Sequence, residues 1–247
     1  MTGNPTLNKN TFTDVQRSSG AGVMTIQGTV DKASILLVLV TLAAAYTWHL
    51  YYSGNIGALM PWMYGGAIAG FVIGLVTSFK REWAPVLAPA YAVCEGLFIG
   101  ALSSVVDAQF HGIVLQAVML TLGTLAALLG CYKIGLIKAT DNFKRGVFAA
   151  TGAIALLYLV TIVLGLFHVN FLPSIYGNGA IGIGFSAVVV IIAAMNLVVD
   201  FDFIEQGAAA GAPKYMEWYS AFGLLVTLVW LYLEILRLLM KLNSRRS

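Results

Sequence analysis

Charged residues are scarce in this sequence. They make up 10% of its 247 residues, whereas about a quarter is usual in soluble domains. Hydrophobic residues make up 59%, and the mean hydropathy is +0.85. A soluble fold of this length cannot bury that much apolar surface, so the composition excludes a cytosolic enzyme and a secreted disulfide scaffold. It also excludes disorder, which requires low hydrophobicity and high charge. The main solvent of this chain is therefore lipid.

Cysteine is rare too, and the side chains of common catalytic and metal sites do not form recognisable patterns. Cys94 and Cys131 both lie in apolar stretches and are interpreted as small core residues. His49, His111 and His168 match no metal-ligand spacing. No phosphate-binding glycine loop, zinc-helix motif or nucleophile elbow is present, so an enzyme is not expected. We expect no bound cofactor and no nucleic-acid partner.

Seven long apolar stretches account for most of the chain. Each approaches the ~20 residues that a helix needs to cross ~30 Å of hydrocarbon. Backbone groups in lipid must be hydrogen-bonded internally, and the stretches are too long for barrel strands, so each predicts a helix. The predicted fold is an all-α, polytopic seven-helix bundle over residues 33–242, with a polar arm at 1–32 and a short basic tail at 243–247. The stretches are 33–52, 60–79, 84–106, 112–132, 147–168, 180–203 and 215–240.

Lysine and arginine are distributed unevenly between the predicted loops. The arm and the loops after the second, fourth and sixth stretches are basic, whereas the connections 51–59, 107–111 and 169–179 contain neither residue. Because cytoplasmic loops carry the excess of basic residues, the amino terminus is predicted to be cytoplasmic. The basic tail breaks this pattern: either the earlier loops outweigh it, or the sixth or seventh stretch does not cross fully. We favour seven crossings, because Arg237 and Lys241 can snorkel outward.

Glycine recurs at every fourth position in two of the stretches. Small residues at this spacing let helix backbones approach closely, so we interpret them as packing sites rather than ligand sites. The positions are Gly66, Gly70 and Gly74 in the second stretch and Gly96 and Gly100 in the third.

Acidic residues within the apolar stretches are the strongest candidates for function. An ionisable group in lipid needs a partner, a water-filled cavity or a bound proton. Glu95 lies near the middle of the third stretch, which contains no basic residue. Asp200, Asp202 and Glu205 lie at the end of the sixth stretch, and Glu217 opens the seventh.

Helix geometry separates these acids. Asp200 and Asp202 are about 200° apart around a helix, and Asp200 and Glu205 about 140°, so at most one or two of them face the interior. If the sixth helix leaves the membrane near Glu205, Asp200 lies about 8 Å inside; it is the deepest of the three and the preferred candidate. The short link 206–214 keeps the sixth and seventh helices adjacent, which allows Asp200 and Glu217 to meet.

Two carboxyl groups in one desolvated site have a simple chemistry. They cannot both ionise at low cost, so the pair titrates as a unit and holds a proton near neutral pH. When both are ionised, they offer the oxygen ligands that Ca²⁺ prefers, so Asp200 with Glu217 is a candidate calcium site. Proton and cation then compete, which makes the site both a sensor and a gate. The alternative is that these acids form a hydrated cytosolic rim, paired with Lys214 and neighbouring basic residues.

Glu234 and Arg237 are a further pair of charges near the far end of the seventh stretch. Their spacing of three residues predicts an intrahelical ion pair. A role in a pore is the alternative interpretation.

Three segments resemble the Bax inhibitor-1 family, and most closely its bacterial integral-membrane branch. They are 85–96 (PVLAPAYAVCEG), 196–205 (NLVVDFDFIE) and 212–218 (APKYMEW). Segments 4–10 and 24–32 are similar to that branch as well, so the resemblance covers nearly the whole chain.

The resemblance implies a seven-helix bundle in which the last helix is central and surrounded by the other six. It also implies a pH-sensitive calcium leak, gated by a pair of acidic residues on the last two helices. Asp200 matches the acid of the sixth helix. The position of the second acid falls near Thr227, which cannot ionise, so the pair is either incomplete or rebuilt with Glu95 or Glu217.

The leading hypothesis is therefore a calcium leak channel of the bacterial inner membrane, with Asp200 as the proton-sensitive element and Glu95 or Glu217 as its partner. Its partners are the lipid bilayer, Ca²⁺ as the transported ion, and protons. The main alternative is a non-conducting regulator that binds other membrane proteins, such as a membrane protease or a stress component. A proton-coupled carrier is a third hypothesis.

Overall fold

Seven long helices form a bundle in the computed structural model, which describes residues 22–167, 175 and 177–245. Each is long and apolar enough to cross a membrane, which confirms the predicted all-α fold. One turn of 3-10 helix, η2 (Arg81–Trp83), precedes the third of them. The seven are α2 (Ile26–Tyr52), α3 (Ile56–Phe79), α4 (Ala84–Gln109), α5 (Ile113–Lys133), α6 (Asp141–Leu166), α8 (Ala180–Ala209) and α9 (Met216–Ser244).

Several helices begin outside the apolar stretches that predicted them. α2 begins at Ile26, inside the polar arm, and α6 begins at Asp141, six residues before its apolar stretch. The side chains of Thr25 and Thr140 cap these two helices by accepting hydrogen bonds from backbone N–H groups of the first turns. Hydropathy marks the part of a helix that suits lipid, whereas a capping side chain marks where the helix begins.

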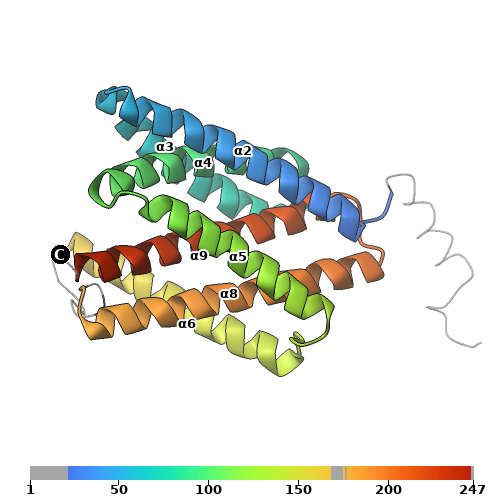
Figure 1. The fold of residues 1–247 in the computed structure, drawn as a ribbon. Helices are drawn as coiled ribbons and strands as arrows, with labels where there is room; N and C mark the ends of the chain where they lie inside the picture. Colours follow the sequence, from blue (N-terminus) through green and yellow to red (C-terminus); the bar gives the residue numbers. More distant parts are fainter. Residues whose placement is uncertain (1–21, 168–174, 176, 246–247) are drawn as a thin grey trace, which may run out of the picture.

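α9 is the central helix and is the most extensively buried of the seven. Figure 1 shows it running through the middle of the bundle, with α2, α3 and α4 on one side and α6 and α8 on the other. It packs against α2, α4, α5 and α8. It also reaches α3, where Phe222 approaches Gly74, and α6, where Tyr158 donates a hydrogen bond to Glu234. The central position of the last helix is thus confirmed.

The glycine stripes are sites of close helix packing, as predicted. A Cβ atom on Gly100 of α4 would overlap the carbonyl oxygen of Ala44 in α2, and one on Gly96 would also meet the α2 backbone. A Cβ atom on Gly66 of α3 would lie 2.6 Å from the carbonyl oxygen of Cys94 in α4. The absence of side chains at these positions therefore allows α2, α3 and α4 to form one tightly packed layer.

One end of the bundle joins the start of α2 to the link between α8 and α9 (Figure 1). The backbone N–H of Met24 donates to the carbonyl of Ala212 at 2.7 Å, and Val23 forms an isolated antiparallel bridge with Pro213. The Met24 side chain is buried and contacts Gly207. We call this the link end; the acids at the end of α8 and the start of α9 lie here.

Replacing Gly100 with Ala is expected to destabilise the protein by about 1–3 kcal/mol, because the added methyl group overpacks the contact with α2. Gly152 of α6 is the matched control, since a Cβ atom there would meet nothing within 4 Å. Thermal unfolding in detergent micelles measures both variants. Equal midpoints for Gly100→Ala and Gly152→Ala would contradict the packing role of Gly100.

Candidate functional site

A cavity of about 680 Å³ lies between α3, α4, α8 and α9. Two carboxyl side chains line it, Glu95 from α4 and Asp200 from α8. No basic side chain is among the described residues of its lining. Hydroxyl groups supply the other polar contacts, from Ser78, Tyr91, Tyr219, Ser220 and Thr227. The cavity is therefore an oxygen-bearing site within an apolar bundle.

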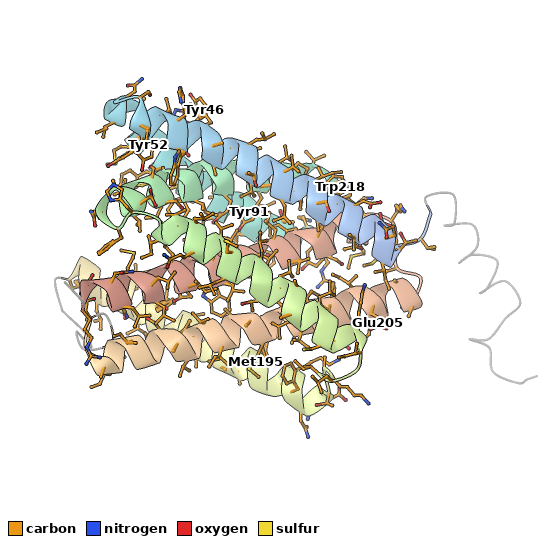
Figure 2. The ribbon with its side chains drawn as sticks, in the orientation of Figure 1. Tyr46, Tyr52, Tyr91, Met195, Glu205 and Trp218 are labelled. Carbon is orange, nitrogen blue, oxygen red and sulfur yellow. The ribbon has the colours of Figure 1, made fainter. Side chains whose placement is uncertain are left out.

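Glu95 reaches the cavity because the helices around it leave room. Tyr91 precedes it by one turn of α4, and the two side chains interact. Tyr91 is buried in the interior of the bundle (Figure 2). Its ring packs edge-on against that of Phe222 of α9, with the ring centres 5.0 Å apart. Across the cavity, a Cβ atom on Gly70 of α3 would lie 3.1 Å from Glu95 Oε2. The glycine thus makes space for the carboxyl group.

Asp200 carries a buried oxygen, Oδ2, that has no hydrogen-bond partner. Its side-chain neighbour is Thr227 of α9, whose hydroxyl also donates to the carbonyl of Gly223 at 3.2 Å. Ser220 Oγ, two turns earlier on α9, is likewise buried without a partner. An unsatisfied buried polar atom costs about 1–3 kcal/mol, so two of them in one lining indicate a place for water, a proton or a cation.

The Thr227 hydroxyl suits both protonation states of Asp200. It has one proton to donate and two lone pairs to accept with. When Asp200 is ionised, the hydroxyl can turn its proton from Gly223 to the carboxylate. When Asp200 is protonated, the hydroxyl can keep its bond to Gly223 and accept from the acid. The Thr227 hydroxyl can therefore provide a hydrogen bond to Asp200 in either protonation state.

Glu217 lies in a separate cluster of ion pairs at the link end. Its side chain is fully buried, with Oε2 at 2.6 Å from Lys32 Nζ and Oε1 at 2.7 Å from Lys214 Nζ. The backbone N–H and hydroxyl of Thr25 both donate to Oε1 at 2.9 Å. A Cβ atom on Gly28 would overlap this carboxylate. The carboxylate thus sits at the N-terminus of α2, where the helix dipole favours a negative charge, and it ties α2 to α9.

The two other acids of α8 point away from the cavity. Asp202 accepts a hydrogen bond from Lys144 of α6 at 2.8 Å. Glu205, labelled in Figure 2 near the end of α5, accepts a hydrogen bond from the Tyr132 hydroxyl. This divergence from Asp200 follows from their angular separation around α8.

The carboxyl group that shares a cavity with Asp200 is thus Glu95, and not Glu217 as the short link between α8 and α9 had suggested. Because α8 and α9 are adjacent, Glu217 lies toward the same end of the bundle as Asp200. There, Lys32 and Lys214 neutralise its charge, and Thr25 fixes its position. The described lining of the Asp200 cavity contains Ser220, one turn after Glu217, but not Glu217 itself.

At the other end of α9, Arg237 Nη1 donates to both carboxylate oxygens of Glu234, at 2.9 and 3.0 Å. Tyr158 of α6 completes this group, with its hydroxyl 2.7 Å from Arg237 Nη1. Lys241 does not snorkel outward as expected; its side chain is buried, because three oxygens accept its hydrogen bonds inside the bundle. These are Ile175 O, Gly182 O and Ser186 Oγ.

Sequence reasoning missed Tyr91 and Ser220, although their spacing contained a signal. Tyr91 lies four residues before Glu95, and Ser220 lies seven before Thr227, so each pair shares a helix face. Within the described residues, no group of three or more His, Cys, Asp or Glu side chains could hold a metal ion. His168 lies outside the described residues.

In the part of the chain that the structure describes, six spanning helices and a central seventh define a polytopic membrane protein, here with a carboxyl-lined cavity in its interior. The chain belongs to the Bax inhibitor-1 family: the sequence model of the family described as Bax inhibitor 1 like matches residues 4–244, which include all seven helices. Searches of curated proteins and of solved structures found no match.

Replacing Glu217 with Gln is expected to lower the free energy of unfolding by about 3 kcal/mol, since it leaves Lys32 with an uncompensated, partly buried charge. Glu82→Gln is the control, because Glu82 is exposed on η2. Thermal unfolding of both variants in the same detergent tests this expectation. A midpoint for Glu217→Gln equal to that of Glu82→Gln would show that the cluster does not stabilise the fold.

Proposed function

We propose that this protein conducts Ca²⁺ slowly down its gradient across a bacterial inner membrane, and that protonation of Asp200 controls the flux. The observation that carries the proposal is the shared cavity of Asp200 and Glu95. Among the described residues, ion pairs form at Glu217, Asp202, Asp141 and Glu234, but at neither of these two acids. Their charge therefore needs a proton or a cation rather than a neighbouring lysine or arginine.

Competition between protons and Ca²⁺ provides the control in this proposal. When Asp200 and Glu95 are ionised, their oxygens and the hydroxyls of Ser220 and Thr227 offer the all-oxygen environment that a hard cation prefers. When Asp200 is protonated, the site loses charge and the cation is released. We expect Ca²⁺ flux to be higher at neutral pH than at acidic pH for this reason.

The cavity extends toward the link end, which we propose to be cytoplasmic. Ser78, near the end of α3, and Tyr219, in the first turns of α9, both belong to its lining. The Arg81 guanidinium lies over the Tyr219 ring, 5.4 Å from its centre. The excess of basic residues in the loops at this end supports an orientation with the amino terminus in the cytoplasm.

Replacing Asp200 with Asn is expected to reduce Ca²⁺ flux at neutral pH by about tenfold, because the affinity of an oxygen site for Ca²⁺ depends on its ligand charge. The variant is also expected to lose most of the pH dependence. Glu95→Gln should also lower the Ca²⁺ flux at neutral pH. Purified protein in liposomes containing a Ca²⁺-sensitive dye provides the measurement.

Glu205→Gln is the matched control, since Glu205 lies on the same helix outside the cavity, and its flux should equal that of the unchanged protein. Equal flux from Asp200→Asn and Glu205→Gln would contradict the proposed site. Absence of flux at every pH, together with recovery of a membrane-protein partner through residues 1–32, would favour the non-conducting regulator instead.

A further inference from the structure

A long crevice separates α2 from α5 on the side of the bundle away from the Asp200 cavity. It consists of two adjoining cavities of about 720 and 580 Å³, which share Leu37 and Leu228 in their linings. α2 and α5 each pack extensively against α9, which forms the floor of the crevice, but not against each other. In Figure 1, α5 passes in front of α9.

The crevice is apolar along most of its length. Along α2, its lining runs from Ile26 to Trp48, a helical rise of about 33 Å, comparable to the ~30 Å hydrocarbon core of a bilayer. Leu125 and Leu129 of α5 line the opposite wall. Val30, on the α2 wall, is 50% exposed, so the crevice opens sideways toward the lipid. Such a shape suits an extended acyl chain.

Positive charge is concentrated at the link end of the crevice. Lys133 and Lys138 belong to the lining, are exposed, and form no ion pair within the described residues. The lining also contains Asp202 and Glu205, but the charge of Asp202 is already matched by Lys144. The two lysine charges therefore outnumber the one carboxylate of the lining that has no basic partner, that of Glu205.

The turn between these lysines has the composition of a membrane-surface segment. Ile134 and Leu136 are 77% and 72% exposed, which is costly in water but favourable in the lipid interface. Lysines flanking such residues lie at the level of the phosphate groups, with their stems in the apolar layer. This arrangement places the ammonium groups where a lipid headgroup would lie.

We propose that the crevice binds an anionic glycerophospholipid, with its phosphate on Lys133 and Lys138 and an acyl chain along α9. The charge of the rim favours an anionic headgroup over one that carries its own cation. The apolar length of the crevice and its lateral opening favour a lipid over free phosphate. This site shares no lining residue with the Asp200 cavity and does not depend on the proposed Ca²⁺ flux.

Native mass spectrometry of the full chain in detergent, titrated with phosphatidylglycerol or phosphatidylcholine, tests the proposal. Phosphatidylglycerol is expected to bind more tightly. Lys133→Gln and Lys138→Gln should each weaken its binding about fivefold, as expected for a lysine near anionic headgroups. Lys80→Gln, at an exposed lysine of the same end outside the crevice, should have no effect. A double Lys133→Arg, Lys138→Arg variant should retain binding, and each variant is first checked for a single symmetric size-exclusion peak.

A larger side chain that fills the crevice tests acyl-chain binding separately from headgroup binding. Ala33 belongs to the lining, so Ala33→Phe should weaken phosphatidylglycerol binding, whereas Ala155→Phe on the exposed face of α6 should not. Equal binding of the two lipids, or lysine variants that behave like Lys80→Gln, would overturn the proposal. Equal phosphatidylglycerol binding by Ala33→Phe and Ala155→Phe would show that the crevice does not hold a lipid chain.

Discussion

This structure depends on one constraint: every buried charge needs a partner. Lipid supplies neither water nor counterions, so an ionisable group inside the bundle must be paired, hydrogen-bonded or protonated. Glu217, Asp202 and Glu234 each have a cation within 3.0 Å, supplied by α2, α6 or α9 itself. Asp200 and Glu95 have none among the described residues, and both line one cavity. This contrast, rather than the number of acids, distinguishes the candidate functional site from the structural ion pairs.

The sequence predicted the number of spanning helices, their approximate bounds and the packing role of the glycine stripes, because lipid imposes length and periodicity on each helix. It also selected Asp200 by depth and angle. It could not select which acid shares a cavity with Asp200, because helix adjacency along the chain does not determine the rotation of each helix. Glu217 lies on the helix next to Asp200 but faces the N-terminus of α2, whereas Glu95 comes from α4, more than a hundred residues away in sequence.

α9 connects the parts of the structure that carry charge. Glu217 at its start joins it to α2, Ser220 and Thr227 line the cavity with Asp200, and Glu234 near its far end binds Tyr158 of α6. One central helix therefore contacts both ends of the bundle and the candidate site between them. A small rotation or shift of α9 would alter all three groups together.

Thr227 lies near the position where the family resemblance places a second acid. A threonine there changes which helices a proton-linked movement would separate. If α8 and α9 each carried an acid, repulsion between two carboxylates would push these two helices apart on deprotonation. Here the second carboxyl of the cavity belongs to α4, while α9 contributes a neutral hydroxyl that suits both states of Asp200. Repulsion between Asp200 and Glu95 would instead act between α8 and α4. Because α4 is packed through Gly96 and Gly100 against α2, and α2 is tied to α9 by Glu217, such a movement would be carried by the α2–α3–α4 layer as a unit.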